Sequence, residues 1–334
     1  MADSRSPRTS DVRAMVVNSY GGPDTLTAQD VHLKAPGRGE VLVRLAVAGV
    51  NFVDIYMRRG MRPVPLPFTP GLEGAGVVEA VGPGVSTVQP GDRVAYAQQP
   101  GAYAESTVVP ADSLIPLPDD VSFEQGAAFP LQGMTAHYLI HEYRKPSEGD
   151  VVLIHAAAGG VGLLLVQWAR HLGARVIGTV STQEKAAAVR EAGAHDVILY
   201  TEQDFAKEIL RMTEGHGADL IIDGVAATTF AGNLQAAALR GHIVIFGAAS
   251  GPADPISPNV LMERSLSLSG GDLWHFMETR EEMLHRAGSV MEGIESGWLM
   301  PRTSKILPLA DAAEAHRLLE DRRTIGKVLL STGN

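Results

Sequence analysis

A glycine-rich turn is the most chemically specific pattern in the sequence. It lies between an apolar run typical of a buried strand, Asp150–Ala156, and a stretch typical of a helix, Val161–Leu172. Such a turn binds a dinucleotide when small residues allow a tight bend, a close approach of backbone to pyrophosphate, and close packing of helix on strand. Ala157, Gly159 and Gly162 occupy these three places. The pattern therefore predicts a dinucleotide site.

The backbone at the start of this helix would hold the pyrophosphate. Unpaired N–H groups and the helix dipole both favour negative charge at a helix N-terminus. A glycine turn also occurs without any ligand, but the order strand, turn, helix is the context that favours dinucleotide binding. We therefore expect the cofactor to contact five consecutive residues, namely Ala158, Gly159, Gly160, Val161 and Gly162.

The end of the second predicted strand of this region indicates which dinucleotide binds. An NAD site places Asp or Glu there, about 20 residues after the glycine turn, to bind the ribose 2′-hydroxyl. Here the strand ends Gly178-Thr179-Val180-Ser181, with Gly178 among the expected cofactor contacts, and Lys185 follows four residues later. A carboxylate would repel a 2′-phosphate, whereas Ser181 and Lys185 could bind it, so the sequence predicts NADPH. Lys185 could also be an ordinary solvated lysine, and Glu184 beside it could serve the helix dipole.

Aromatic residues close two further predicted strands. Tyr200 ends the third strand of the region, and Phe246-Gly247 ends the fifth. Ligands bind at the carboxyl ends of parallel strands, so Tyr200 could pack along the adenosine and Phe246-Gly247 near the nicotinamide ribose. Both could equally be core or rim aromatics.

The usual devices that polarise a carbonyl substrate are missing. None of the seven tyrosines has a lysine four positions on, and the chain has no cysteine. His137 and His141 have metal-ligand spacing on a predicted helix, but no third ligand is evident, so a packing role and no metal are expected. His155 is likewise expected to be a packing residue at a strand end. Hydride transfer with little acid–base help suits an acceptor that is already electron-poor, such as a quinone or a conjugated enone.

Two regions with different sequence patterns must position these residues. Short apolar runs broken by Gly and Pro predict an all-β, barrel-like region before residue 135, and four prolines make 59–70 a loop. The expected strands are Arg13–Val17, Glu40–Val47, Gly74–Val81, Arg93–Ala97 and Glu105–Val109.

After residue 135, continuously apolar strands alternate with helices, which predicts a doubly wound parallel sheet of the Rossmann type. The expected strands are Asp150–Ala156, Arg175–Val180, Asp196–Tyr200, Asp219–Val225, His242–Phe246 and Ser265–Ser269. The expected helices between them are Val161–Leu172, Gln183–Ala192, Asp204–Thr213 and Thr229–Leu239.

The C-terminal region returns to mixed character. Met277–Ser296 and Ala310–Asp321 are expected to be helical, and Lys327–Leu330 a final strand. We therefore predict an α/β protein with a catalytic domain formed by residues 1–134 and 270–334 and a cofactor domain formed by residues 135–269. Residues 1–12 are expected to be a disordered tail.

Composition limits the functions that are open to the chain. Its 334 residues are enough for about two domains. A formal net charge of −10 argues against nucleic acid or an anionic membrane as a partner. No apolar run approaches the length of a membrane span, and the polar start lacks the apolar stretch of a secretory signal. Together with the lack of cysteine, this favours a cytoplasmic location.

The chain as a whole, from about Arg13 to Leu330, resembles the medium-chain dehydrogenase/reductase superfamily. Within it, the chain is most similar to the NADPH:quinone oxidoreductases related to zeta-crystallin, whose catalytic domain is GroES-like. The segments that carry the resemblance are 48–56, 70–76, 81–85, 90–94, 155–162, 178–185 and 326–328. Zinc-dependent relatives have Cys where this chain has the segment 49–51, and His at Leu72. The resemblance therefore implies the zinc-free branch.

The resemblance also implies roles for individual residues. Asn51 is expected to line the nicotinamide pocket, with Asp54 and Tyr56 at the mouth of the substrate site. The residues expected around the nicotinamide are Gln132, Thr135 and Phe246. Those expected around the 2′-phosphate and adenosine are Ser181, Lys185 and Tyr200, with help from Arg322, Arg323 or Lys327. From the residues alone, Asn51 could be a turn cap and Asp54 a helix N-cap.

These observations favour reduction of quinones by NADPH. Reduction of an activated double bond in enones or alkenals is the alternative that the same pocket could support. An NADPH-binding sensor or structural protein with little turnover is an alternative of another class. Family members are usually dimers, which implies a homodimer joined through the strand near Ser265–Ser269.

Overall fold

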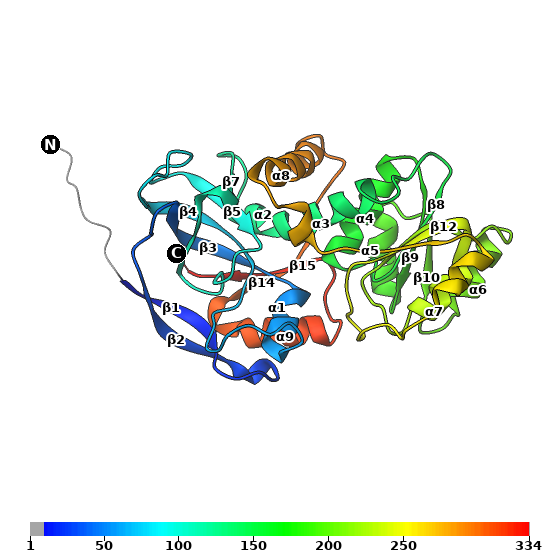
Figure 1. Cartoon of the computed structure of the whole chain (residues 1–334), viewed down its shortest axis with the longest axis horizontal. Coiled ribbons are helices and arrows are strands. Elements are labelled where there is room, and N and C mark those ends of the chain that lie inside the picture. Colours follow the sequence, from blue (N-terminus) through cyan, green and yellow to red (C-terminus); the bar gives the residue numbers. More distant parts are fainter. Residues whose placement is uncertain (1–9, 334) are drawn as a thin grey trace. The chain divides into compact units, whose positions relative to one another are not determined.

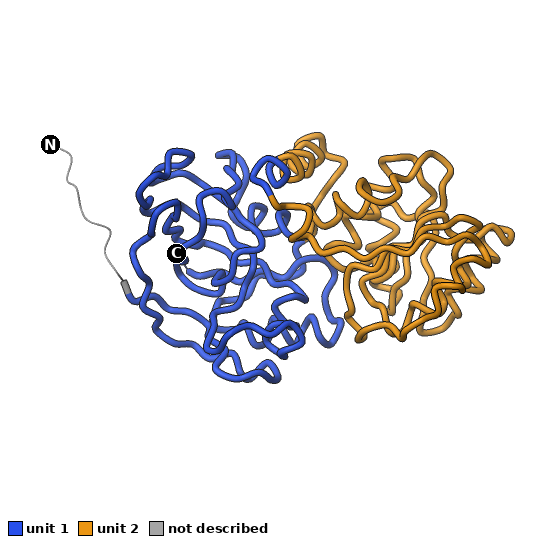
Figure 2. Tube along the Cα trace, in the orientation of Figure 1, with its two compact units in different colours: residues 1–131, 279–284, 303–334 blue, residues 132–278, 285–302 orange. Residues whose placement is uncertain are grey.

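The computed structural model describes residues 10–333, which form two compact units. Unit 1 contains residues 1–131, 279–284 and 303–334, and unit 2 contains residues 132–278 and 285–302 (Figure 2). The first boundary lies close to the expected one between residues 134 and 135. The expected tail, residues 1–12, lies mostly outside the described residues, but strand β1 already begins at Ser10.

A seven-stranded sheet forms the framework of unit 1 (Figure 1). Its strand order is β14-β15-β3-β4-β5-β7, and β6 pairs with β3. The strands of this sheet are β3 Glu40–Val50, β4 Glu73–Val81, β5 Arg93–Ala97, β6 Ser106–Pro110, β7 Leu114–Pro116, β14 Thr303–Pro308 and β15 Lys327–Ser331. A separate antiparallel pair consists of β1 Ser10–Val17 and β2 Leu26–Leu33.

Each of the five strands expected before residue 135 has a counterpart in unit 1, and three additional strands were not expected. β2 and β14 are edge strands with mostly exposed or half-buried side chains. Because neither buries a regular apolar face, neither shows the alternation that identifies a strand from sequence. β7, the third, has only three residues.

Three helices belong entirely to unit 1. They are α1 Phe52–Arg59, α2 Phe123–Ala128 and α9 Ala312–Glu320. Asn51 is the N-cap of α1, and the helix ends at Gly60, whose φ of 75° is left-handed. Asp54 is therefore the third helical residue and not the cap, and its carboxylate accepts the backbone N–H of Asn51 in the return bond of a capping box.

Unit 2 contains the doubly wound parallel sheet, as expected. All six strands are parallel, in the order β10-β9-β8-β11-β12-β13, so the chain winds in opposite directions from the central strand β8. The strands are β8 Val151–Ile154, β9 Arg175–Val180, β10 Asp196–Leu199, β11 Ala218–Asp223, β12 Ala237–Ile245 and β13 Ser267–Gly270. The helices between them are α4 Gly160–His171, α5 Gln183–Glu191, α6 Phe205–Met212 and α7 Phe230–Ala236. Helix α3, Pro130–His141, precedes the sheet.

The predicted helix over 229–239 is wrong in its last three residues. α7 ends at Ala236, and β12 begins immediately at Ala237. Ala237 and Ala238 are fully buried beside β11. An alanine-rich apolar run has no periodicity that separates helix from strand, so only the pairing with β11 settles its conformation.

The C-terminal part of the chain does not return to unit 1 as a single segment. Helix α8, Arg280–Glu295, crosses from unit 1 into unit 2, and the chain remains in unit 2 until residue 302. Trp298 stacks on His171 with ring centroids 4.0 Å apart and meets Trp168 edge-on. Gln167 also exchanges two hydrogen bonds with the backbone of Met300. These contacts with α4 explain why residues 285–302 do not belong to unit 1.

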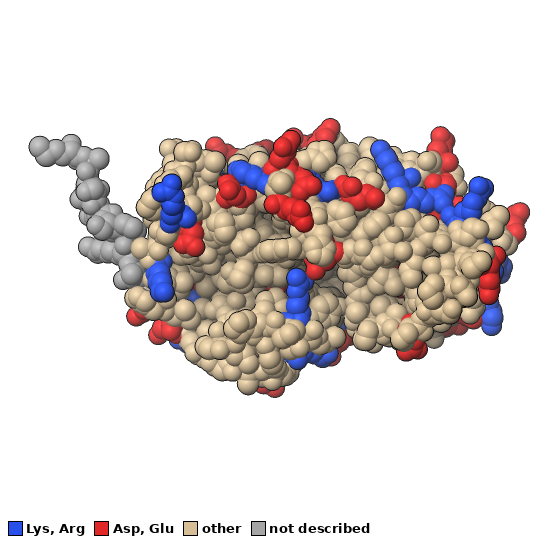
Figure 3. All heavy atoms as spheres, viewed as in Figure 1, with Lys and Arg blue, Asp and Glu red and all other residues tan. Residues whose placement is uncertain are grey.

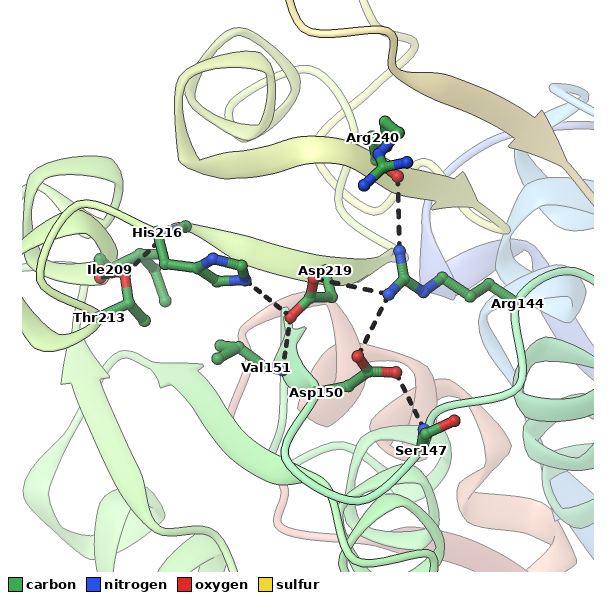
Figure 4. A network of polar contacts seen from close by, with 10 residues as sticks. Arg144, Ser147, Asp150, Val151, Ile209, Thr213, His216, Asp219 and Arg240 are labelled. Atoms are coloured by element: carbon green, nitrogen blue, oxygen red, sulfur yellow. Dashed lines mark hydrogen bonds and ion pairs between the residues drawn. The ribbon is translucent and has the colours of Figure 1, made fainter.

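A polar network ties together the amino ends of the central strands of unit 2 (Figure 4). The Asp219 carboxylate accepts the backbone N–H of Val151 at 2.9 Å and contacts His216 at 3.1 Å. Arg144 bridges Asp150 and Asp219 and also donates to the carbonyl of Arg240. This network lies at the end of β8 opposite to the glycine turn, so we assign it to stability.

Replacing Asp219 should destabilise unit 2. In Asp219→Ala the buried N–H of Val151 loses its acceptor, which should cost about 1–3 kcal/mol in the free energy of unfolding. Urea denaturation would measure this loss. The matched control is Asp254→Ala, which removes an exposed carboxylate of the same unit. Equal stability of the two variants would contradict the assignment.

Candidate active site

The glycine turn follows β8 and has the conformation that its residues predict. Ala156 has a left-handed φ of 48°, and its carbonyl accepts the N–H of Gly159 at 2.9 Å. Gly159 is the N-cap of α4, and the helix begins at Gly160. The N–H of Ala157 donates to the carbonyl of Thr179, which fixes the turn to the neighbouring strand β9.

Each of the three glycines of the turn has a different structural role. A Cβ at Gly162 would lie 2.5 Å from the carbonyl oxygen of Ala156, so this glycine permits the packing of helix on turn. A Cβ at Gly160 would lie 1.8 Å from Oε1 of Gln132, so the Gln132 amide rests against the turn. At Gly159, by contrast, an added Cβ would meet only one atom of the described residues within 4 Å, the carbonyl oxygen of Ala156 at 3.2 Å, which is a tight contact. Apart from that atom, no protein atom covers this position, which leaves room for the close approach of a pyrophosphate.

The predicted 2′-phosphate residues lie at the adjoining carboxyl ends of β9 and β10. Ser181 directly follows β9, and the hydroxyl of Thr201, just after β10, donates to its carbonyl. Thr182 caps α5 by accepting the N–H of Lys185, which places Lys185 in the first helical turn. Tyr200 directly follows β10 and is 38% exposed. No carboxylate lies on β9 or between Ser181 and Lys185 except that of Glu184.

Gly178 has a packing role. A Cβ at this position would lie 2.8 Å from the side chains of both Ala157 and Val189. Gly178 therefore lets the strand pack against the glycine turn and α5, and the structure gives no reason to expect a direct contact with the cofactor.

Phe246 and Gly247 follow β12 beside the end of β11. The Phe246 ring lies against Gly224, where an added Cβ would be 2.8 Å from the ring. A Cβ at Gly247 would lie 2.9 Å from the Gly224 carbonyl oxygen. Phe246 is half-buried, and Thr135 on α3 is buried. Thr135 and Phe246, two of the three predicted nicotinamide residues of unit 2, thus have defined positions, and Phe246 lies at the carboxyl edge of the sheet.

A buried polar chain beneath the glycine turn was not predicted from the sequence. His155 contacts Thr179 at 2.9 Å and Asn233 at 2.7 Å, and Asn233 in turn donates to Asp223 at 2.6 Å. Burial lowers the pKa of His155, partly offset by Asp223. The other oxygen of Asp223 accepts the backbone N–H of Val225 at 2.7 Å. This chain joins the carboxyl ends of β8, β9 and β11, so His155 does more than pack at a strand end.

Asn51 belongs to a buried charged cluster in unit 1. Its Oδ1 accepts from Nζ of Lys327 at 2.8 Å, and its Nδ2 donates to Oε2 of Glu73 at 2.9 Å. Lys327 and Glu73 also form an ion pair, and both are almost completely buried. Glu73 accepts a third bond from the N–H of Leu131, and an added Cβ at Gly49 would lie 2.3 Å from its Oε2. Asn51 is therefore held in one orientation from both sides.

The expected role of Lys327 at the 2′-phosphate is wrong. Its ammonium is buried in unit 1 and neutralised by Glu73. Lys327 thus supports Asn51. Arg322 is exposed, with a left-handed φ of 57°, and also belongs to unit 1.

Asp54 is wholly buried, which differs from the expected place at the mouth of a substrate site. Its Oδ2 accepts the backbone N–H of Asn51 at 2.8 Å and the Tyr103 hydroxyl at 3.1 Å. Burial raises the pKa of Asp54 to about 7, although the hydrogen bond from Asn51 and the charge of Lys327 oppose the shift. Tyr56, one helical turn before the end of α1, is half-buried and packs near Phe52.

Residues distant in the sequence extend this cluster. The Tyr103 hydroxyl contacts Nε2 of His316 at 3.0 Å, and Nδ1 of His316 lies 3.3 Å from the buried guanidinium of Arg58. Arg58 is paired with Glu320 at 2.7 Å. Burial, with a smaller effect of Arg58, lowers the pKa of His316 to about 3, so this imidazole is neutral. Sequence reasoning missed Glu73, Tyr103 and His316 because their partners are far away along the chain.

The pair His137 and His141 packs in unit 2 as expected. Their rings are 4.6 Å apart and meet Trp168 edge-on. Arg286 lies 3.0 Å from Nδ1 of His137, and burial is the main cause that lowers the pKa of His137 to about 3. Among residues 10–333, no group of three or more His, Cys, Asp or Glu side chains could hold a metal ion.

Comparison with known proteins identifies both halves of the chain. Residues 37–119 match the family model of the alcohol dehydrogenase GroES-like domain, and residues 160–288 match that of the zinc-binding dehydrogenases. The matches confirm the expected GroES-like domain and the Rossmann-type cofactor domain.

Individual relatives match over almost the whole chain. A 2-haloacrylate reductase from a Burkholderia species is 42% identical over 96% of this chain and 98% of its own length. A quinone oxidoreductase from Pseudomonas aeruginosa is 41% identical, with coverages of 93% and 97%. A mycobacterial structure complexed with NADPH superposes with a TM-score of 0.93 at 45% identity, covering 96% of this chain and 99% of that one. The chain therefore belongs to the medium-chain dehydrogenase/reductase superfamily and is similar to its quinone oxidoreductases.

Proposed function

We propose that this protein is an NADPH:quinone oxidoreductase that works without a metal. The observation that carries the proposal is the cofactor half of the site: an open glycine turn on β8, with Ser181 and Lys185 at the end of β9, where NAD-specific proteins have an acid. The Pseudomonas relative is called a quinone oxidoreductase, and the mycobacterial neighbour was solved with NADPH.

The residues of unit 2 fit an NADPH molecule. Gly159 leaves its backbone open, and the N-terminus of α4 offers N–H groups and a favourable dipole to the pyrophosphate. The hydroxyl of Ser181 and the ammonium of Lys185 would hold the 2′-phosphate, and Tyr200 would pack along the adenosine. When bound, NADPH supplies the hydride. Gln132, which rests against the glycine turn, and Thr135 and Phe246 would surround the nicotinamide.

We assign the binding of the electron acceptor to unit 1. Asn51 and Tyr56 stand at or near the start of α1, and the cluster around Lys327 fixes Asn51. Asp54 is wholly buried and supports Asn51 by accepting its backbone N–H. A rigid polar wall of this kind can orient an acceptor. Arg322 and Arg323, both exposed, are the remaining candidates of unit 1 for a contact with the cofactor.

The protein should oxidise NADPH in the presence of quinones. The decisive measurement is the loss of NADPH absorbance over a panel of quinones, enones, alkenals and 2-haloacrylate. We expect quinones to give the highest kcat/KM, because an electron-poor acceptor needs mainly orientation. Tight binding of NADPH without turnover of any acceptor would instead support a sensor or structural role.

Reduction of an activated carbon–carbon double bond is the second candidate, favoured by the 2-haloacrylate reductase relative. The panel separates the two functions if it is run with NADPH deuterated at C4. Deuterium retained on a carbon of the product indicates double-bond reduction. Its absence from an isolated hydroquinone indicates quinone reduction.

The protein should bind NADPH much more tightly than NADH. Lys185→Ala should weaken NADPH binding by about 10-fold and leave NADH binding nearly unchanged, because a charged hydrogen bond contributes about 1.5–3 kcal/mol. Fluorescence titration measures both dissociation constants. Lys207→Ala is the control, since Lys207 is an exposed lysine on α6 paired with Asp204. Equal affinity of the parent protein for the two cofactors would refute this specificity.

We further propose a homodimer joined through β13, located in the cytoplasm. β13 is the last strand of the sheet of unit 2, its side chains are mostly exposed, and Leu268 on it is 37% exposed. Edge strands of this kind invite pairing with a second chain. Charged side chains on such an edge oppose pairing, and the lack of cysteine suits a reducing compartment.

Leu268→Lys should therefore shift the protein from dimer to monomer. Light scattering coupled to size-exclusion chromatography would measure the mass. Met300→Lys, at an exposed position of unit 2 outside β13, should leave the mass unchanged. A parent protein that already has the mass of a monomer would disprove the dimer.

The few charged side chains on the face shown in Figure 3 are of both signs, which fits a small-molecule substrate better than nucleic acid. No helix within residues 10–333 has the length and apolar character needed to cross a membrane.

A further inference from the structure

Helix α1 has an inverted distribution of polar and apolar side chains. Two of its three charged residues, Asp54 and Arg58, are completely buried, whereas Phe52 is 37% exposed and Tyr56 is half-buried. A helix at the surface of a globular protein normally turns its apolar side chains inward and its charges outward. The open face of α1 is therefore apolar for a reason other than the packing of unit 1.

The aromatic side chains on this face lie in a row. Phe52 and Tyr56 are four residues apart, which places them on the same side of the helix, and their ring centroids are 6.3 Å apart. Gly60 follows after four more residues and ends the helix. A Cβ at Gly60 would lie 2.9 Å from Cγ of Tyr20, so the Tyr20 ring rests on this glycine. The row of Phe52, Tyr56 and Tyr20 thus extends over about 12 Å, the rise of eight helical residues.

The loop that follows α1 adds two exposed apolar side chains. The backbone N–H of Met61 donates to the Tyr56 carbonyl at 2.9 Å, and the Tyr20 hydroxyl is hydrogen-bonded to both the N–H and the carbonyl of Val64. The loop is therefore fixed to the row at two points. Met61 is 53% exposed and Leu66 is 39% exposed.

These side chains form what we call the apolar platform, which consists of Tyr20, Phe52, Tyr56, Met61 and Leu66. Four of its members are exposed, and the only other exposed large hydrophobic side chain in the described part of unit 1 is Ile306. Single exposed apolar residues are normal, but a gathering of them marks a binding surface. The exposed charges within residues 52–67 are Arg59, which is ion-paired with Glu320, and Arg62, so a cationic ligand is disfavoured.

The size and place of the platform indicate what covers it. A stable protein interface needs about 20–30 residues on each side, far more than the platform offers. The platform begins directly after Asn51 and includes Tyr56, which are the residues that we assign to the acceptor. A single quinone ring spans little more than the 6.3 Å between the rings of Phe52 and Tyr56, whereas the whole row is about twice as long. The remaining length fits an uncharged chain attached to the ring.

We propose that the apolar platform binds an aliphatic substituent of the electron acceptor, so that the preferred substrates are quinones that carry an alkyl chain. The inference rests on the proposed function. Phe52 and Tyr56 contact the part of the chain next to the ring, and Tyr20, Met61 and Leu66 contact its far end. The chain does not react, so the platform binds it equally in the ground state and in the transition state. Such binding lowers KM and leaves kcat unchanged.

A series of benzoquinones with alkyl chains from methyl to octyl tests the proposal in the wild-type protein. KM should fall by up to about 4-fold for each added methylene group, because each one leaves water, while kcat stays constant. The decrease should level off when the chain reaches the end of the row, about 12 Å from its start. A KM that is independent of chain length overturns the proposal.

The double variant Met61→Ser/Leu66→Ser separates the platform from a general preference for apolar quinones. It should raise KM for octylbenzoquinone by about 10-fold and flatten the dependence on chain length, because the far end of the platform is lost. Phe52→Ser should weaken the dependence already for short chains. The matched control is Ile306→Ser, which removes the exposed hydrophobic side chain of unit 1 outside the platform and should keep the wild-type dependence. Fluorescence titration with NADPH shows that each variant is folded.

The two levels of the argument can fail separately. If the wild-type protein oxidises NADPH with no quinone of any chain length, the proposed function fails and the substrate class falls with it. If all quinones of the series are reduced with the same KM, the function stands and only the platform's role is rejected. A double variant that keeps the wild-type dependence on chain length but has a different mass by light scattering would show that a second copy covers the platform. That result also overturns the proposal.

Discussion

The buried ion pair of Lys327 and Glu73 is the interaction on which the rest of unit 1 depends. It brings together β15, the first residue of β4 and the cap of α1, and it reaches the backbone of Leu131 through the second oxygen of Glu73. Two charges without water are tolerable only because each satisfies the other and both bind the Asn51 amide. Loss of either partner would leave an uncompensated charge in the core, at a cost of about 3–5 kcal/mol. The start of α1 is thus as rigid as the sheet that carries it.

Rigidity at that point has a chemical consequence. Because the amide of Asn51 is held on both sides, its backbone N–H is fixed as well, and this N–H is a donor to Asp54. The Asp54 carboxyl lies between this donor and Tyr103 and is removed from water. Burial of one more acid beside a pair that is already neutral raises its pKa. An acid with a pKa near neutrality therefore arises from packing and charge balance, without a metal ligand or a specialised catalytic motif.

Unit 2 also contains a buried polar network, but there it supports the carboxyl ends of the parallel strands. A parallel sheet leaves the carboxyl ends of its strands close together, and the chain must turn there without covering the backbone that a ligand needs. The chain from Thr179 through His155 and Asn233 to Asp223 binds three of these ends from below. The glycine turn above it stays open at Gly159, while Gly160 and Gly162 are closed against protein atoms. Within the four residues 159–162, Gly160 and Gly162 therefore pack against the protein, while Gly159 leaves the backbone open to a ligand.

The sequence by itself determined the features that depend on local chemistry. Continuously apolar runs identified the parallel strands, the absence of side chains identified the turn, and the presence of Ser181 in place of an acid at the end of the second strand indicated the cofactor. Each follows from the conformation or charge of neighbouring residues. The buried clusters could not be found in this way, since Glu73 and Lys327 are 254 residues apart and Arg58 and His316 are 258 apart. Whether Lys327 binds a phosphate or an acid, and whether Asp54 is exposed or buried, depends on which strands pair. Only the tertiary structure decided that, because burial and distant partners set the charge state and the role of an ionisable side chain.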